Sequence, residues 1–310
     1  MKEAGAGFVG PRDRDLSMRL LGNRPWVQLL VGVPLGLVAA SVAGVTQVAI
    51  AFGVQGARSW EAALSTPWPG QPIGMAIQVA AATFVMWLVA RKIAGRPVIE
   101  LERRGAVREL AWGGVIGASI VTTAVALLWA FGVYEVSGVT IGRGLIAGVL
   151  LGLGSAFGEE VVMRGILLRM LVGKLGVVAA LAVTSLFFGL LHLGNPHSSL
   201  LGAIGIALQA GILFGAGYLL TRRLWLAIGI HAAWNFTQTA VFGLSVSGVP
   251  TEPGLLVARL DGPAWLSGGT VGIEGSVVTI AFGLIASALM LRAATARKSR
   301  MHELSARIPG

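Results

Sequence analysis

Long apolar runs without charges alternate with short polar joints along most of the chain. A helix needs about 20 apolar residues to cross about 30 Å of hydrocarbon. When the runs are cut at joints rich in Pro, Gly or Asn, eight spans of this kind are predicted, at about 26–51, 73–90, 110–133, 144–171, 177–193, 200–220, 224–242 and 272–291. The pattern therefore predicts an all-α polytopic membrane protein with eight transmembrane helices.

The basic residues predict the orientation of these spans. Lys and Arg prefer the cytoplasmic side of a membrane, and an N-terminus placed in the cytoplasm puts 21 of the 24 Lys and Arg on that side. Only Arg58, Arg143 and Arg259 then lie outside. We expect both termini to be cytoplasmic, with tails at 1–24 and 293–310, and one transmembrane domain at 25–292 whose motifs lie within about 144–242.

Composition narrows the class of protein further. Hydrophobic residues make up 55% of the 310 residues and charged residues 12%, which is atypical of a soluble protein. The chain has no Cys, so disulfides, thiolate metal sites and thiol nucleophiles are excluded. Its net charge of +10 falls in short clusters between apolar runs, which argues against nucleic-acid binding. The composition rich in Ala, Gly, Val and Arg is typical of bacteria, and we expect a multi-pass protein of the bacterial plasma membrane.

A few polar side chains interrupt the predicted spans. Ionisable residues there cost about 2.5–3.5 kcal/mol each on insertion scales and are functional candidates by default. Glu274, at the outer end of the last span, is expected to be an interfacial charge. The others are Glu159, Glu160 and Arg164 in the fourth span, His192 (with Phe188 four residues before it) in the fifth, and His231 and Asn235 in the seventh.

Helical spacing separates the two carboxylates. Glu160 and Arg164 are four residues apart with the acid first, which favours an ion pair, whereas Glu159 points about 100° away around the helix. Glu160 also continues a stripe of small residues at every fourth position from Gly144 to Ala156, which is typical of a helix-packing face. We therefore expect Glu160 to be paired inside the bundle and Glu159 to be the free carboxylate.

Depth in the membrane groups these residues on three helices. With 1.5 Å of rise per residue, Glu159 and His192 lie about 18 and 22 Å above the ends of their spans, and His231 and Asn235 about 10 and 16 Å. A carboxylate beside a His can hold and deprotonate a water, and two further donors can stabilise an oxyanion. This set is suited to amide hydrolysis, although each His alone is also compatible with an interhelical hydrogen bond.

Other protease chemistries find less support in the sequence. His302-Glu303 lacks the second His of an HExxH zinc motif. Aspartyl chemistry needs two Asp in spans, but every Asp of the chain lies outside them. No Ser within a span has an evident His partner. A glutamate base remains, and this interpretation needs neither a cofactor nor a metal.

Three ordered motifs carry a resemblance to a known family. Glu159-Glu160 with Arg164, Phe188 with His192, and His231 with Asn235 match the pattern EExxxR, FxxxH and HxxxN. In these motifs the chain resembles the CAAX-protease and bacteriocin-processing (CPBP, or ABI) membrane proteins, which include the type II CAAX prenyl endopeptidases. The matching positions cover about 80 residues, and the flanking spans are similar only in being spans.

The resemblance implies an intramembrane glutamic endopeptidase that is independent of metal. Glu159 would activate water together with His192, His231 and Asn235 would form the oxyanion hole, and Glu160, Arg164 and Phe188 would support the site. The expected partners are the bilayer and a peptide or protein substrate at the membrane, including lipid-anchored ones. Two alternatives stay open: a zinc hydrolase using Glu159, His192 and His231, and a non-catalytic scaffold or bacteriocin self-immunity protein.

Overall fold

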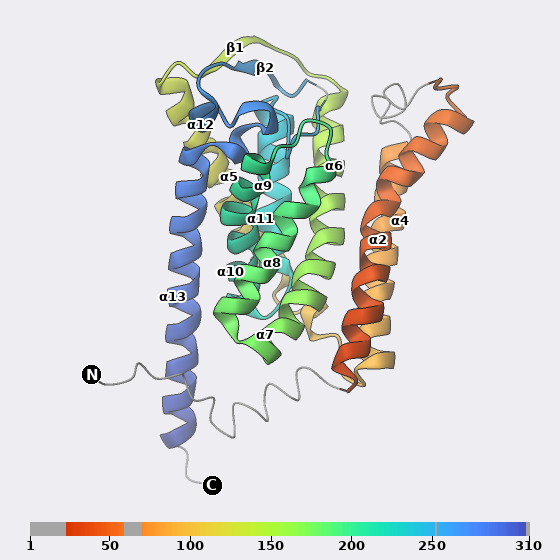
Figure 1. Cartoon of the computed structure of the whole chain (residues 1–310), viewed down its shortest axis with the longest axis vertical. Coiled ribbons are helices and arrows are strands. Elements are labelled where there is room, and N and C mark those ends of the chain that lie inside the picture. Colours follow the sequence, from red (N-terminus) through yellow and green to blue (C-terminus); the bar gives the residue numbers. More distant parts are fainter. Residues whose placement is uncertain (1–22, 59–69, 252, 308–310) are drawn as a thin grey trace.

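The computed structural model describes residues 23–58, 70–251 and 253–307, so the predicted N-terminal tail lies almost entirely outside the described residues. These residues form a bundle of long helices capped at one end by a small β-ribbon (Figure 1). The α-helices are α2 (Pro25–Gly53), α4 (Gly70–Trp87), α5 (Ala106–Ala130), α6 (Arg143–Glu160), α7 (Arg169–Leu175), α8 (Val177–Leu191), α9 (Leu200–Ile206), α10 (Ile212–Thr221), α11 (Trp225–Phe236), α12 (Ala264–Ser267) and α13 (Val277–Arg307).

Short segments of other helical geometry interrupt or extend these helices. The π-helical ones are η1 (Leu88–Ile93), η3 (Val161–Leu168), η5 (Ala207–Gly211) and η6 (Thr237–Val241), and the 3₁₀ ones are η2 (Ile99–Leu101), η4 (His192–Gly194), η7 (Gly269–Val271) and η8 (Ile273–Gly275). Such π-helical insertions are frequent at functional sites. Here η3 begins directly after the two adjacent glutamates, so the change of helical geometry coincides with the residues of interest.

Seven helices in the described part of the chain are long and apolar enough to cross a membrane, one fewer than the sequence predicted. The difference arises at the predicted span 224–242. There α11 has 12 residues and η6 has 5, which is just short of the 18 residues that a spanning helix requires. The helix nevertheless lies in the interior of the bundle, where nine of the 12 residues of α11 are buried.

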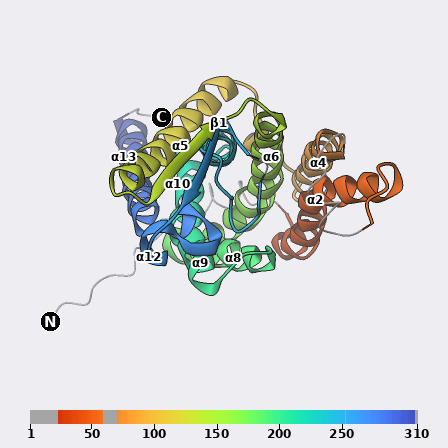
Figure 2. The same ribbon diagram turned by 90° about the horizontal axis from the view of Figure 1, so that it is seen from above.

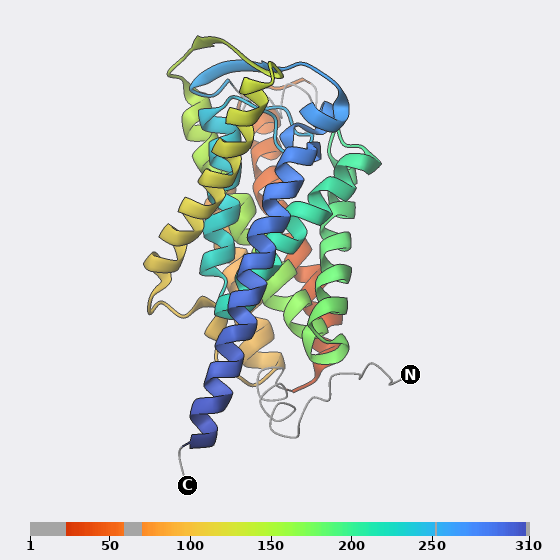
Figure 3. The same ribbon diagram turned by 90° about the vertical axis from the view of Figure 1, so that its left-hand side faces the viewer.

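The chain enters and leaves the bundle at the same end. The first residue of α2 and the last turns of α13 lie at the end opposite the β-ribbon (Figure 1). The predicted C-terminal tail is helical up to Arg307, as a continuation of α13. Seen from the side, α13 crosses the face of the bundle obliquely (Figure 3). That both ends are cytoplasmic remains a prediction.

The β-ribbon was not predicted from the sequence. Strand β1 (Tyr134–Val139) pairs antiparallel with β2 (Leu256–Leu260), with a register shift between Val136 and Gly138. The Tyr134 hydroxyl donates to the Phe242 carbonyl oxygen at 3.0 Å and ties the ribbon to the end of η6. Both strands are short and lie more than 100 residues apart in sequence, so no local pattern shows that they pair. The fold is therefore mostly helical rather than all-α.

Close packing brings α11 against α6. A Cβ atom added at Gly152 would lie 2.7 Å from the Ala232 carbonyl oxygen, and one added at Gly148 would lie 2.6 Å from the Ala240 Cβ. Only glycine permits this approach of two backbones. The small-residue stripe predicted from the sequence therefore packs against α11, and this contact brings His231 next to the end of α6.

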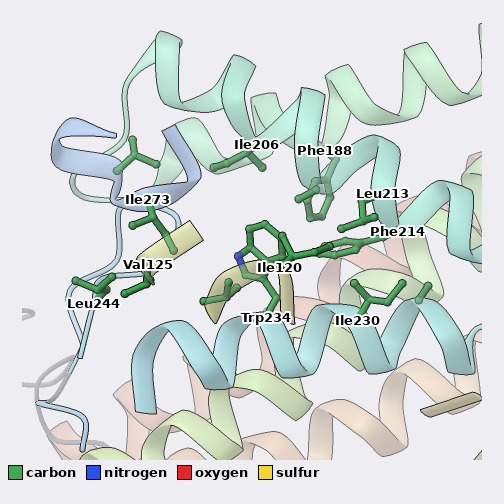
Figure 4. Packing of buried hydrophobic residues seen from close by; sticks show 14 of the residues in the cluster. Ile120, Val125, Phe188, Ile206, Leu213, Phe214, Ile230, Trp234, Leu244 and Ile273 are labelled. Carbon is green, nitrogen blue, oxygen red and sulfur yellow. The ribbon is translucent and has the colours of Figure 1, made fainter. Parts of the chain in front are cut away.

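The core consists of apolar side chains from the inner helices. Seen from above, α5, α6, α8, α9 and α13 lie around α10, while α2 and α4 stand to one side against α6 (Figure 2). Phe188, Leu213, Phe214, Ile230 and Trp234 meet in the centre (Figure 4). These rings and branched side chains exclude water from the middle of the bundle and fix the helices that carry the polar groups described next.

Candidate active site

A cavity of about 360 Å³ lies between α2, α6, α8, α11 and the loop that follows η6. Its volume is within the range of small-molecule and substrate pockets. The predicted catalytic side chains all line it, together with Phe188: Glu159, His192, His231 and Asn235. Glu160 and Arg164 lie behind the wall rather than on it. The structure thus brings residues separated by up to 76 positions to one cavity.

The two adjacent glutamates have different surroundings. Glu160 is fully buried, and its Oε1 accepts from Arg164 Nη1 at 2.8 Å and from His231 Nδ1 at 3.0 Å. Glu159 lines the cavity, and its buried Oε2 has no hydrogen-bond partner among the described residues. The pairing expected from the spacing of Glu160 and Arg164 is therefore present. Glu160 Oε2 also has no hydrogen-bond partner among the described residues, but of the two carboxylates only Glu159 lines the cavity.

Arg164 links two parts of the bundle behind the cavity. It is 2% exposed, and its Nη2 donates to the Gly211 carbonyl oxygen of η5 at 3.0 Å. The guanidinium also lies over the rings of Phe188 and Phe214, with centroid distances of 4.7 and 5.3 Å. A buried cation held in this way contributes little net stability but is costly to leave unpaired. Arg164 therefore depends on Glu160 for its compensating charge.

The hydrogen bond of His192 to the Phe188 carbonyl oxygen fixes which of its two ring nitrogens has a free lone pair. Its Nδ1 lies 2.7 Å from the Phe188 carbonyl oxygen, which can only accept a hydrogen bond. Nδ1 therefore carries the hydrogen, and in the neutral ring Nε2 is an acceptor. His192 stands at the end of α8, and its ring packs edge-on against Phe188 at 4.7 Å. The imidazole is held in a state that can accept a proton from water.

His231 and Asn235 occupy successive turns of α11. The ring of His231 stacks on Phe214 at 4.4 Å with an interplanar angle of 17°, so its orientation is fixed by packing as well as by Glu160. Asn235 Nδ2 donates to Ser155 Oγ at 2.9 Å, and Ser155 Oγ donates to the Leu151 carbonyl oxygen at 2.7 Å. Because the hydroxyl hydrogen is used on Leu151, Ser155 presents a lone pair to the amide and orients its NH₂ group.

Four polar residues of the cavity wall, one of them Ser41 of α2, were not predicted from the sequence. Ser155 lies four residues before Glu159, so helical spacing could have placed it on the same face. Asn195 and Ser247 come from loops, and Asn195 Nδ2 donates to the Ser247 carbonyl oxygen at 2.7 Å. No periodic pattern relates these two residues, so only the folded chain shows that they are neighbours.

Glu274 differs in its surroundings from the predicted charge at the membrane interface. It is 3% exposed, and its carboxylate accepts hydrogen bonds from the backbone N–H and the Oγ of Ser247. Burial raises the pKa of its carboxyl above the ordinary value, and the bonds from Ser247 oppose this shift. Glu274 lies just before the last span, as expected, but it is buried rather than exposed because the loop after η6 packs against it.

The arrangement of side chains does not favour the zinc alternative. In the described part of the chain, no three His, Asp or Glu residues lie close enough together to hold a metal ion. His231 Nδ1 is also bonded to Glu160, and His192 Nδ1 to the Phe188 carbonyl oxygen, so each imidazole already uses one of its two nitrogens. The geometry fits acid–base chemistry on a water molecule better than coordination of a cation.

A comparison with protein families finds a match in the segment that carries most of the cavity residues. Residues 140–237 are similar to the family described as type II CAAX prenyl endopeptidase Rce1-like. The matched segment includes α6 to α11 and therefore all four predicted catalytic residues. No curated protein and no solved structure matches the chain.

Proposed function

Because the chain belongs to the Rce1-like type II CAAX prenyl endopeptidase family, we propose that it is an intramembrane peptidase in which Glu159 activates water. The substrate is a peptide or protein anchored in or close to the membrane. One observation carries the proposal: a carboxylate with a free oxygen, two oriented imidazoles and an oriented amide from three helices share one cavity.

Glu159 and His192 are the groups that hold and deprotonate the water. The carboxylate of Glu159 and the Nε2 lone pair of His192 can each accept a hydrogen bond, so a water between them would donate both of its hydrogens. Its oxygen attacks the carbonyl carbon of the scissile bond while Glu159 takes one proton. The same proton then passes to the leaving amine as the C–N bond breaks.

His231 and Asn235 stabilise the oxyanion that forms on the carbonyl oxygen. Asn235 keeps one N–H for this purpose, since the other is bound to Ser155. His231 can donate from Nε2 only if this nitrogen carries a hydrogen, and Nδ1 already shares a hydrogen with Glu160. Donors aimed at a developing oxyanion are each worth about 10²–10³ in rate.

The position of the cavity suits a substrate that arrives from the lipid. Leu37, Ala40 and Ser41 of α2 form one wall, and Leu191 at the end of α8 forms part of another. Leu191 is 42% exposed on the apolar side surface of the bundle. We propose that a chain held at the membrane enters the cavity beside Leu191.

Comparison of membrane proteomes tests the proposal. A deletion strain is complemented with the wild type, Glu159→Gln or Glu135→Gln, a control at an exposed ion pair with Arg259 on the β-ribbon. New peptide termini should appear with the wild type and Glu135→Gln and be absent with Glu159→Gln. If all three strains differ from the deletion but share the same termini, the non-catalytic scaffold explains the protein better.

A further inference from the structure

A tight two-residue turn forms part of the rim of the cavity. Val246 and Val249 exchange backbone hydrogen bonds at 2.8 and 3.2 Å, and both line the cavity. Between them Ser247 and Gly248 have φ values of 49° and 77°. Two successive positive φ values define a type I′ turn, which favours Asn or Gly at its first position. Ser247 therefore adopts a conformation that serine disfavours, and neighbouring groups must hold it there.

Glu274 provides this support from the opposite side of the turn. Its Oε1 accepts from Ser247 Oγ at 2.9 Å and its Oε2 accepts from the Ser247 backbone N–H. Gln238 Nε2 lies 3.5 Å from the same Oε2 and donates to the Ser245 carbonyl oxygen at 2.6 Å. The Gly248 N–H donates to the carbonyl oxygen of Val271, which lies in the same loop as Glu274, at 3.0 Å. The left-handed conformation of Ser247 is thus held by a buried carboxylate, whereas Gly248 adopts positive φ without such support.

The turn connects Glu274 to the end of α8. The Ser247 carbonyl oxygen accepts from Asn195 Nδ2 at 2.7 Å, and the Asn195 backbone N–H donates to the His192 carbonyl oxygen at 3.1 Å. Ser247, Asn195 and His192 all line the cavity. A continuous series of hydrogen bonds therefore runs from Glu274 to the residue that ends α8 and carries one of the two acceptors for water.

We propose that Glu274 is a positioning residue of this active site: by holding Ser247 in the left-handed conformation, it sets the rim of the cavity and the place of His192. This inference rests on the proposed peptidase function for its effect on cleavage. Its effect on the rim is independent of any activity. Glu274 touches neither water nor substrate in this role and acts only through Ser247 and Asn195.

A single introduced cysteine can report on the rim because the chain has none. Val246 lines the cavity and is 4% exposed, so Val246→Cys places a thiol beside the turn that is protected while the turn is held. Its rate of reaction with a soluble maleimide follows how often the rim opens. We expect Glu274→Ala to raise this rate about fivefold, the factor that corresponds to one net hydrogen bond. Glu274→Gln should have a smaller effect, and Glu135→Gln none.

Ser247→Gly separates positioning from general damage to the fold. Glycine adopts positive φ without help, so Glu274→Ala/Ser247→Gly should label more slowly than Glu274→Ala alone and recover part of the Glu159-dependent cleavage. A merely destabilised protein would not be rescued by a second change to glycine. If Glu274→Ala does not fold, the same comparison is made with Glu274→Gln.

The outcomes distinguish this inference from the proposed function. Unchanged labelling in both Glu274 variants, or no rescue by Ser247→Gly, would overturn the role of Glu274. Faster labelling with rescue supports it. If labelling behaves as expected but cleavage by the wild type is the same as by Glu159→Gln, the peptidase function fails while the anchoring of the rim by Glu274 stands.

Discussion

Replacing Glu160 by alanine tests the central electrostatic argument. Glu160 is fully buried and bonds both Arg164 and His231. The substitution removes the anion that is hydrogen-bonded to the Arg164 guanidinium, which is 2% exposed, and leaves only the more distant charge of Glu159. It also leaves His231 Nδ1 without an acceptor. We therefore expect Glu160→Ala to lower the stability of the fold and to abolish cleavage.

The size of the stability loss depends on the contacts that Arg164 retains in the variant. Removing one partner of a buried ion pair costs about 3–5 kcal/mol. Arg164 retains the Gly211 carbonyl oxygen and the rings of Phe188 and Phe214, which still stabilise the cation. The lower end of the range, about 3 kcal/mol, is therefore expected. At about 2–4 °C per kcal/mol this corresponds to a fall in Tm of at least about 6 °C.

Thermal unfolding of the purified protein measures this change. The chain has nine Trp, and Trp234 is buried in the core, so intrinsic fluorescence follows the loss of packing. Glu135→Ala, which removes an exposed ion pair with Arg259, is the control and should leave Tm unchanged. Glu160→Ala/Arg164→Met should be more stable than Glu160→Ala, since it also removes the unpaired charge. An unchanged Tm for Glu160→Ala would refute the assigned pairing.

Three further predictions concern the cavity and its rim. Glu159→Gln should keep the Tm of the wild type and lose cleavage, measured as the yield of new peptide termini, because it preserves shape and removes the base. Ser155→Ala should lower kcat about tenfold, because Asn235 stays in place but its amide is less well oriented. This is less than the loss of about 10²–10³ expected when an oxyanion donor is removed, and steady-state kinetics on the identified substrate measure it. Burial raises the pKa of Glu274 above its ordinary 4.5, so the stability of the wild type relative to Glu274→Gln should be greatest below pH 4.5 and fall as the pH rises through the raised pKa. Melting curves of both proteins between pH 4 and 9 would contradict this if the difference in Tm did not depend on pH.

Features that depend on local spacing could be predicted from the sequence. Long apolar runs predict helices because a chain in an apolar environment must satisfy its backbone hydrogen bonds internally. The observed helices start within a few residues of the predicted spans. The Glu160–Arg164 pair follows from a separation of four residues on one helix. The small-residue stripe on α6 likewise predicted a packing face, which the approach of Gly152 to Ala232 confirms.

Features that depend on contacts between distant segments could not be predicted. His231 bonds Glu160 only because glycines on α6 let α11 approach, and no local pattern encodes which helix comes close. The β-ribbon pairs strands more than 100 residues apart, and α11 with η6 is a buried helix just shorter than a span. The hydrophobicity of a helix indicates that its surroundings are apolar, but it does not show whether those surroundings are lipid or other helices.

Glu274 and Ser247 show the same limit at the site itself. By its place in the sequence Glu274 is a charge at the end of an apolar run, and Ser247 is an ordinary loop residue. The folded chain buries the first and holds the second in a left-handed turn, because each satisfies the polar groups of the other. The sequence by itself determined the helices and the residue types available for chemistry, since these follow from local apolarity and spacing. Only the tertiary structure decided which groups are paired, which oxygen stays free and what holds the rim, since hydrogen bonds between distant segments form only after the helices have packed.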